Sequence, residues 1–354
     1  MGSIPAEVTF FTSPALTPSL TAPDFLDKAL QGVIFDVRSP GEYANGHIPG
    51  AVSFPLFTNE ERAIVGTLYK KKGKNEAMLN GLEIVGPKLR SFVEKAYEIS
   101  EGKPLFIHCW RGGMRSSSMA VLLQTAGLKC HLLKGGYKSY RNHILEEFEK
   151  PWPIRVIGGK TGSGKTRVLH ALQSLGQQVI DLEGLAHHKG SAFGKIGELP
   201  QPSTEQFGNN LYQQLSKLDG SKTVWLEDES QMIGKIFIPA EFYRKYRNSP
   251  LVVLDIAFEK RVEYLVKVYG NYPKDEIIEA FSRIRKKLGG QHLNKALQCI
   301  ETGDISEVVR IALNYYDKTY LYGLAHKDTT QITYLTFESL EPYLIAKHLS
   351  ANYP

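Results

Sequence analysis

Short apolar runs alternate with charged, amphipathic segments along most of the chain. The apolar runs predict strands over 32–38, 52–54, 104–107, 154–157, 179–183, 223–230, 251–256 and 331–335. Helical spacing predicts helices over 23–30, 117–123, 167–175, 261–265 and 277–288, and helices flanking the last strand in the tail from 305 to 353. This alternation predicts an α/β fold, with functional sites on loops beyond the strand ends.

The length of the chain predicts two domains rather than one. A chain of 354 residues exceeds what one hydrophobic core normally supports, so two domains are expected. The charged, proline-containing stretch 146–153 is the candidate junction, which gives domains over 1–148 and 149–354. Residues 1–20, rich in Pro, Ser and Thr, are expected to form an extended lead-in. The second domain is expected to end in a helical part.

The composition bears on the cellular compartment in which the protein is expected to work. No basic region followed by an apolar run opens the chain, and no apolar stretch approaches the length of a membrane span, so no membrane partner is expected. The three cysteines are widely spaced and predict neither a disulfide framework nor a zinc site. A reducing, cytoplasmic location fits this pattern.

Positive charge gathers in two places. The net charge is +6, and the stretch 231–295 holds thirteen Lys or Arg against seven Asp or Glu. A second basic run comprises Lys70, Lys71, Lys72 and Lys74. Localised positive charge suits a polyanion such as nucleic acid, although a solvated helix face has the same composition. The best candidates for contact with a phosphate backbone end the helix predicted over 277–288: Arg283, Arg285, Lys286 and Lys287.

The first candidate site surrounds Cys109. This cysteine follows a predicted strand and precedes a loop with two glycines and the start of a helix. Loop amides and a helix N-terminus attract negative charge and favour the reactive thiolate. Arg111 and Arg115 could add a clamp on a tetrahedral oxyanion. The alternative is that Cys109 is only a small buried apolar side chain.

The second candidate site is a phosphate-binding loop. Residues 159–166 match the pattern G-x-x-x-x-G-K-[ST], with a predicted strand before and a predicted helix after. Backbone amides around Gly159, Gly162 and Gly164 would cradle phosphates. Lys165 would reach the terminal phosphate oxygens and Thr166 would face Mg²⁺.

Carboxylates and histidines follow the next two strands of this domain. Asp181, Glu227 and Asp228 stand at predicted strand ends, where an acid can orient Mg²⁺ or water; simple solvent exposure is the alternative. His187 and His188 are adjacent, but no third ligand stands near them. Substrate contact or helix capping is therefore favoured over metal binding for the two histidines.

Three motifs resemble the rhodanese family. The segments 36–43 and 46–51 are similar to its fingerprint, the Cys109 loop occupies the place of its persulfide cysteine, and 132–137 resembles its closing Gly-Gly motif. In that family Asp36 and Arg38 mainly organise the fold. The loop from Cys109 to Arg115 is one residue longer than in many sulfur-transferring members, which suits an anion of phosphate size.

The two sites together resemble the tRNA 2-selenouridine synthase family over roughly residues 20–340. The segments that carry this resemblance are 108–116, 158–166 and 181–194. It implies a rhodanese-like α/β domain followed by a P-loop α/β domain. It also implies modification of wobble 2-thiouridine in tRNA: S-geranylation by geranyl diphosphate, then replacement of the sulfur by selenium from selenophosphate. A supplier of selenophosphate would be a partner, and no cofactor would be tightly bound, although Mg²⁺ could take part.

Other classes of function remain open at this point. A Cys-dependent phosphatase fused to a kinase would use the same Cys-x5-Arg spacing. A nucleic-acid-binding NTPase could carry the rhodanese-like domain only as a scaffold. An ATP-dependent tRNA sulfurtransferase is disfavoured, because its Ser-Gly-Gly-x-Asp-Ser adenylation loop is absent from the sequence.

Overall fold

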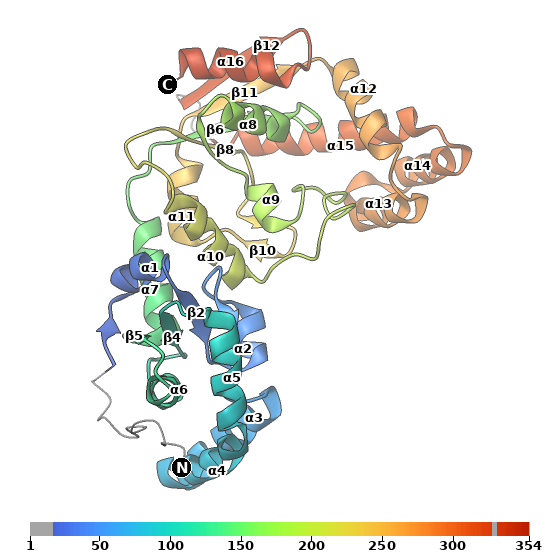
Figure 1. Cartoon of the computed structure of the whole chain (residues 1–354). Coiled ribbons are helices and arrows are strands. Elements are labelled where there is room, and N and C mark those ends of the chain that lie inside the picture. The colour runs from blue at the N-terminus through green and yellow to red at the C-terminus, as the bar shows by residue number, and fades with distance from the viewer. Residues whose placement is uncertain (1–16, 328–330, 354) are drawn as a thin grey trace, which may run out of the picture. The chain divides into compact units, whose positions relative to one another are not determined.

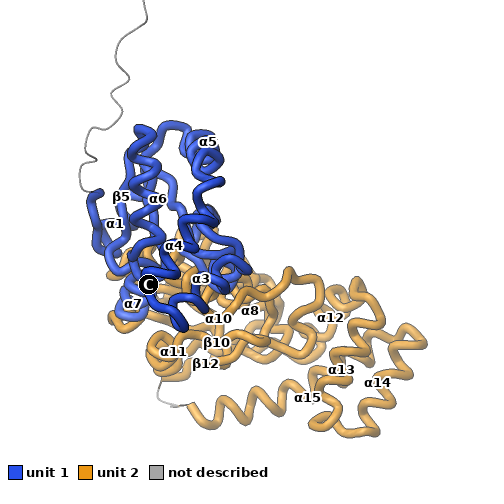
Figure 2. The backbone as a smooth tube through the Cα atoms, turned by 90° about the horizontal axis from the view of Figure 1, so that it is seen from below, with its two compact units in different colours: residues 1–147 blue, residues 148–354 orange. Residues whose placement is uncertain are grey.

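The chain divides into two compact units, residues 1–147 and 148–354 (Figure 2). The structure, a computed structural model, describes residues 17–327 and 331–353. Among these residues, no helix combines the length and apolarity needed to cross a bilayer.

The first unit contains a five-stranded sheet in which every pairing is parallel (Figure 1). The strand order is β1-β5-β4-β2-β3. The strands are β1 (Ser19–Leu20), β2 (Val33–Asp36), β3 (Val52–Ser53), β4 (Leu105–His108) and β5 (Cys130–Leu133). The helices are α1 (Ala22–Ala29), α2 (Pro40–Asn45), α3 (Asn59–Lys72), α4 (Lys74–Val85), α5 (Leu89–Ser100), α6 (Met114–Thr125) and α7 (Gly136–Phe148), with a 3₁₀ turn over Gly86–Lys88.

A buried ion pair ties the centre of this unit together. Arg38 and Asp36 are both fully buried, with 2.6 Å between Arg38 Nη2 and Asp36 Oδ2. The same guanidinium donates to the carbonyl of Gly46 at 2.6 Å and lies 3.8 Å from the ring centre of Tyr137. The pair thus joins β2 to the end of α2 and to the start of α7, which supports the expected structural role of both residues.

The second unit also contains a five-stranded parallel sheet, in the order β12-β11-β6-β8-β7. Its strands are β6 (Ile154–Gly159), β7 (Gln178–Ile180), β8 (Val224–Glu227), β11 (Leu251–Ile256) and β12 (Ile332–Phe337), and β9 (Met232–Ile233) pairs with β10 (Ile236–Phe237) in a hairpin. Its helices are α8 (Lys165–Ser174), α9 (Leu182–Ala186), α10 (Thr204–Leu215), α11 (Ala240–Arg247), α12 (Phe258–Tyr269), α13 (Lys274–Leu288), α14 (Gly290–Thr302), α15 (Ile305–Leu324) and α16 (Pro342–Asn352).

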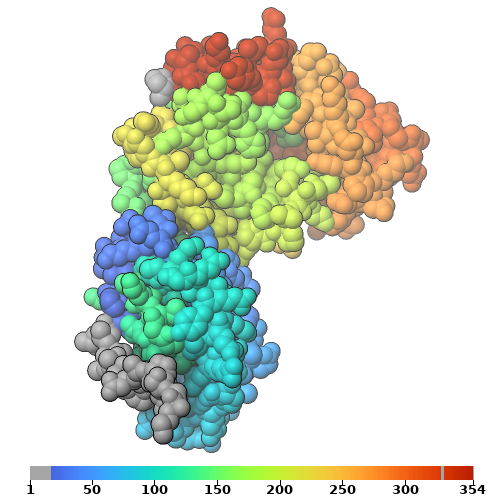
Figure 3. All heavy atoms as spheres, viewed as in Figure 1, coloured from blue at the N-terminus to red at the C-terminus, as the bar shows by residue number. Residues whose placement is uncertain are grey.

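Helices α12 to α15 form a helical part with an apolar core of its own. Phe193, Tyr269, Phe281, Ile300 and Leu313 are buried together there. In the space-filling view the residues of α12–α14, drawn in orange, gather at one end of this unit (Figure 3). The expected fold class is confirmed: an α/β rhodanese-like unit is followed by a P-loop α/β unit with a helical C-terminal part.

Element bounds depart from expectation where local capping outweighs the apolar pattern. The strand over 251–256 has the predicted bounds. The strand predicted over 179–183 is wrong at its end: β7 stops at Ile180, because the side chain of Asp181 accepts from Gly184 N and starts α9. Helix α6 begins at Met114, three residues before the predicted start. In the predicted lead-in over 1–20, residues 19 and 20 form β1, and residues 1–16 lie outside the described residues.

Replacing Arg38 with Leu should lower the free energy of unfolding of the first unit by about 3–5 kcal/mol, because Asp36 would remain buried without a counter-charge. Hydrogen exchange of the β2 peptide at increasing urea concentration measures this change. The control is Arg90→Leu, which removes an exposed ion pair with Glu94 on α5 and should leave β2 exchange unchanged. Equal exchange in both variants would contradict the structural role of the pair.

Candidate active sites in the two units

Cys109 lies directly after β4, at the start of the loop that leads into α6. Its side chain is 3% exposed. The sulfur accepts the Gly113 N–H at 3.3 Å and lies 3.2 Å from Ser116 Oγ. One backbone N–H at the start of α6 therefore donates to the sulfur, as an anionic nucleophile requires, and the Ser116 hydroxyl lies beside the sulfur and donates to the Gly113 carbonyl at 3.1 Å.

The closing Gly-Gly motif fixes the shape of this loop. Tyr137 N–H donates to the carbonyl of Cys109 at 2.8 Å, and Lys138 N–H donates to the carbonyl of Trp110 at 3.0 Å. Gly136 has φ +63°, and a Cβ there would lie 2.4 Å from the Cys109 carbonyl oxygen. Only glycine fits this close approach, so α7 and the cysteine loop hold each other in place.

Arg115 is engaged by a carboxylate from another element. Its guanidinium donates to both oxygens of Glu42, at 2.6 and 3.2 Å. Glu42 also accepts the Ser39 N–H at 3.0 Å in the capping box of α2. Burial alone would raise the pKa of Glu42, but the hydrogen bond and charge of Arg115 outweigh it and lower that pKa.

The structure therefore brings a different set of residues to the sulfur than the sequence predicts. Gly113 and Ser116 contact Cys109, whereas Arg115 is held against Glu42 and Arg111 is exposed. The sequence signals Glu42 as the third residue of a capping box, but not its link to Arg115, 73 residues away. Ser116 carries no signal beyond its place at the start of a helix.

The P-loop has the strand–loop–helix order that its motif requires. Lys165 begins α8, and its Nζ donates to the carbonyl of Gly159 at 3.1 Å. Gly162 has φ +80°, and a Cβ there would lie 2.9 Å from Leu265 of α12. The amide of Gly159 donates to the hydroxyl of Tyr320 on α15 at 2.8 Å. The loop is thus packed directly against the helical part of the unit.

Three carboxylates gather beside this loop. Thr166 Oγ1 donates to Glu183 at 3.0 Å, and the Glu183 N–H donates to Glu227 Oε1 at 2.9 Å. Burial, followed by the repulsion of Glu183, raises the pKa of Glu227 well above its usual value. Burial also raises the pKa values of Glu183 and Glu229. Glu183 and Glu229 were not singled out from the sequence: the first lies inside the strand predicted over 179–183, and the second lies at the end of the strand predicted over 223–230.

The other two predicted acids have different partners. Asp181 caps α9 and lies 2.7 Å from His170 Nε2. Asp228 forms a short ion pair with Lys327, which is 99 residues away in the sequence. Both carboxylates are therefore engaged by protein groups, and Asp228 also lines the pocket beside the P-loop.

A divalent ion would find few protein ligands here. Within residues 17–327 and 331–353, no group of three or more His, Cys, Asp or Glu side chains is arranged to hold a metal ion. The buried Oε2 of Glu227 has no hydrogen-bond partner among these residues, and Thr166 supplies a hydroxyl. Mg²⁺ typically takes one or two protein oxygens and completes its shell with phosphate oxygens and water, so these two groups fit an ion carried by a diphosphate.

The adjacent histidines follow directly after the last turn of α9. His187 has φ +49°, its backbone N–H closes the helix, and its ring lies 2.9 Å from the carbonyl of Pro200. His188 is 8% exposed. Burial, with the charge of Arg283, lowers the pKa of His188. Of the two readings favoured from the sequence, helix capping is the one these contacts support.

The phosphate-binding loop borders a pocket of about 550 Å³, which aromatic and aliphatic side chains also line. Gly162, Gly164, Lys165 and Thr166 line the pocket from the loop and the start of α8. Further lining side chains come from α12, α15 and the loop after α9, and include Tyr264, Leu265, Val268, Tyr269, Tyr316 and Phe193. The spacing of Leu265, Val268 and Tyr269 signals an apolar helix face, but such a face usually indicates core.

The predicted basic cluster lies at the end of α13. Arg283, Arg285, Lys286 and Lys287 are all exposed there. Arg283 is tethered, because it donates to Glu279 at 2.5 Å and to the carbonyl of Ala192 at 3.3 Å. The cluster is a positively charged end of a helix, which is the arrangement that a phosphate backbone can approach.

Two family models match the chain, one in each unit. A family model described as the tRNA 2-selenouridine synthase AAA domain matches residues 152–350, and the rhodanese-like domain model matches residues 22–143.

Three curated relatives are each named tRNA 2-selenouridine synthase. The one from Sulfurovum sp. (strain NBC37-1) is 38% identical over 292 residues, which cover 76% of this chain and 79% of the relative. The one from Marinobacter nauticus is 32% identical and covers 86% and 92%, and the one from Hydrogenovibrio crunogenus is 35% identical and covers 83% and 90%. Because identity exceeds 30% over most of both lengths, the chain belongs to the tRNA 2-selenouridine synthase family.

Proposed function

We propose that this chain converts 2-thiouridine at the wobble position of tRNA to 2-selenouridine in two steps. The first step alkylates the sulfur with geranyl diphosphate, and the second replaces the geranylated sulfur with selenium from selenophosphate. Family membership supports the tRNA substrate and the selenated product. The proposal makes the protein a transferase that acts in the cytoplasm and takes selenophosphate from a separate supplier.

The pocket at the P-loop is the observation that carries the first step. Its lining combines the phosphate-binding loop and Lys165 with the side chains of Leu265, Val268 and Tyr269. A ligand that uses both kinds of lining group carries a diphosphate and a hydrocarbon chain. Prenyl diphosphates have this form, and burial of each CH₂ group contributes about 0.8 kcal/mol to binding.

The alkylation step needs a good leaving group and no nucleotide hydrolysis. The uridine sulfur attacks C1 of the geranyl chain, the S–C1 bond forms, and the C1–O bond to diphosphate breaks. Negative charge then grows on the departing diphosphate, where the loop amides and Lys165 stabilise it. Mg²⁺ held by diphosphate oxygens, with Thr166 and Glu227, would supply further positive charge there.

The selenation step is assigned to the Cys109 loop. Alkylation converts the uridine sulfur into a better leaving group. The Cys109 thiolate would take the phosphoryl group of selenophosphate, so that the P–Se bond breaks and selenide is released, and water would then hydrolyse the S–P bond to phosphate. Selenide forms the C2–Se bond as the C2–S bond breaks, and geranyl thiol leaves. Cys109 is the nucleophile that handles selenium, and the amide of Gly113 and the hydroxyl of Ser116 surround its sulfur. Selenophosphate is a tetrahedral oxyanion, for which the amides at the start of α6 are suitable donors.

The exposed cluster of Arg283, Arg285, Lys286 and Lys287 is proposed to contact the tRNA backbone. Arginine and lysine side chains bind phosphates without reading sequence, so this cluster would set affinity rather than choose the target uridine.

Replacing Cys109 with Ser should abolish formation of 2-selenouridine and leave geranylation intact, because the two steps use different units. Mass spectrometry of tRNA nucleosides should then show S-geranyl-2-thiouridine accumulating. The control is Cys130→Ser in β5, whose thiol is buried with its pKa raised by that burial to about 12; it should keep both steps. Selenation by the Cys109 variant would refute the assignment of the nucleophile.

Replacing Lys165 with Ala should slow geranyl transfer by roughly 10²–10³-fold, because a charge that stabilises the departing diphosphate is lost. The initial rate of S-geranyl-2-thiouridine formation is the measurement. The control is Lys222→Ala. This exposed lysine lies just before β8, at the amino ends of the parallel strands, whereas the P-loop lies at their carboxyl ends. An unchanged rate in the Lys165 variant would remove the P-loop from the reaction.

A further inference from the structure

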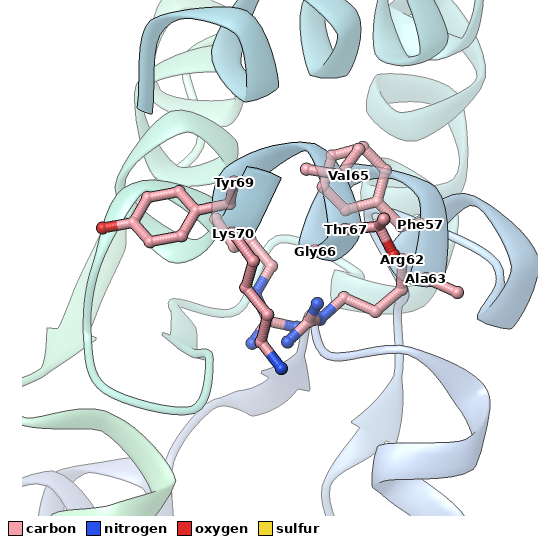
Figure 4. A pocket seen from close by; sticks show the side chains of 9 residues that line it. Phe57, Arg62, Ala63, Val65, Gly66, Thr67, Tyr69 and Lys70 are labelled. Atoms are coloured by element: carbon pink, nitrogen blue, oxygen red, sulfur yellow. The ribbon is translucent and has the colours of Figure 1, made fainter. Parts of the chain in front are cut away.

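The basic run Lys70–Lys72 has no role in the function proposed above. These residues end α3, and Lys74 begins α4. All four side chains are exposed. The run leads into a pocket of about 510 Å³ in the first unit, which is drawn in Figure 4.

Three cationic side chains from two elements line this pocket. Arg62 and Lys70 come from α3, and Figure 4 shows both side chains pointing into the same space. Arg115 comes from α6, at the end of the cysteine loop. The pocket therefore shares a side chain with the loop that carries Cys109.

The charges in this pocket are only partly compensated. Glu42 pairs with Arg115 at 2.6 Å and with Arg62 at 3.7 Å, so a single carboxylate serves two guanidinium groups. Lys70 adds a third positive charge, and Lys71 and Lys72 continue the positive potential along the end of α3. A polyanion is the complementary partner for such a surface.

The remaining walls suit a nucleobase. The buried Phe57 and the partly buried Val65 line the pocket, and Tyr69, which is 60% exposed, lines it next to Lys70 in the sequence. Exposed aromatic rings next to basic side chains are the surface on which single-stranded bases stack. Gly66 leaves room for this arrangement, because a Cβ there would lie 2.5 Å from Arg62 Nη1.

We propose that this pocket and the adjoining lysine run bind the single-stranded segment of tRNA next to the target uridine, with phosphates on Arg62 and Lys70 and a base on Tyr69. The proposal rests on the proposed function, since it assumes that tRNA is the substrate. It adds a second contact surface for tRNA, on the unit that carries the selenation site. The uridine can then be presented to Cys109 by a strand held through its own backbone.

A free oxyanion has the same phosphate chemistry but fits the pocket less well. A single tetrahedral anion occupies a small part of 510 Å³ and has no use for Phe57 or Tyr69. It also leaves the lysines beyond the pocket without a partner. A nucleotide strand uses the volume, the aromatic wall and the lysine run together.

The test measures binding of 2-thiouridine tRNA to the full chain at several salt concentrations. Lys70→Ala should weaken binding and reduce the steepness of the log–log salt dependence by roughly 0.7, the value for one contact to a single-stranded phosphate. Tyr69→Ala should weaken binding about fivefold or more at every salt concentration. Both side chains are exposed, so both variants should keep the wild-type circular dichroism spectrum.

The control is Lys129→Ala, an exposed lysine just before β5 and so at the sheet edge opposite to Cys109. It removes the same charge and should bind tRNA as the wild type does. Wild-type affinity and salt dependence in the Lys70 and Tyr69 variants would overturn the proposal. Wild-type tRNA binding together with a raised KM for selenophosphate in the Lys70 variant would also overturn it, in favour of a small-anion pocket.

The outcome separates this inference from the proposed function. If the wild-type chain itself fails to bind 2-thiouridine tRNA, the proposed function fails. If the wild type binds and forms 2-selenouridine while the variants are unaffected, only the inference about this pocket fails.

Discussion

The parallel pairing of strands in both sheets is the constraint on which the two sites depend. In a parallel sheet all strand carboxyl ends meet at one edge, and the helices that follow them point their N-termini there. Cys109 follows β4 and precedes α6, and the P-loop follows β6 and precedes α8. The same backbone geometry therefore builds an anion-binding cradle in each unit. What differs between the cradles is the chemistry of the side chains placed in them.

The two cradles handle charge in different ways. Around Cys109 the nearest polar groups are the amide of Gly113 and the hydroxyl of Ser116, both neutral, and the positive charge of Arg115 is paired with Glu42. Beside the P-loop, buried carboxylates with raised pKa values lie next to Lys165 and Thr166. The pocket beside this second cradle is lined by several aromatic and aliphatic side chains of α12 and α15, whereas the pocket that shares Arg115 with the cysteine loop is lined by three cationic side chains. These differences suit the proposed order of reactions, in which one site transfers an alkyl group from a diphosphate to the uridine sulfur and the other site exchanges that sulfur for selenium.

Local patterns in the sequence predicted the elements that hold the sites, but not the partners of the site residues. The strand over 251–256, the cysteine loop and the P-loop depend on neighbours in the chain and could be recognised. Arg115 with Glu42 and Asp228 with Lys327 join residues 73 and 99 positions apart, which no local pattern reveals. Glu183 was misplaced because the cap at Asp181 ends β7 earlier than the apolar run suggests. The tyrosines of the pocket were missed because the sequence pattern of an apolar helix face is the same whether that face packs into a core or lines a ligand pocket.

We propose that one chain performs two ordered steps, with geranylation required before selenation. The most direct measurement is mass spectrometry of nucleosides from 2-thiouridine tRNA incubated with the chain, omitting geranyl diphosphate and selenophosphate in turn. We expect S-geranyl-2-thiouridine when selenophosphate is omitted, unchanged 2-thiouridine when geranyl diphosphate is omitted, and 2-selenouridine only when both are present. Formation of 2-selenouridine without geranyl diphosphate would show that the two steps are not ordered in this way.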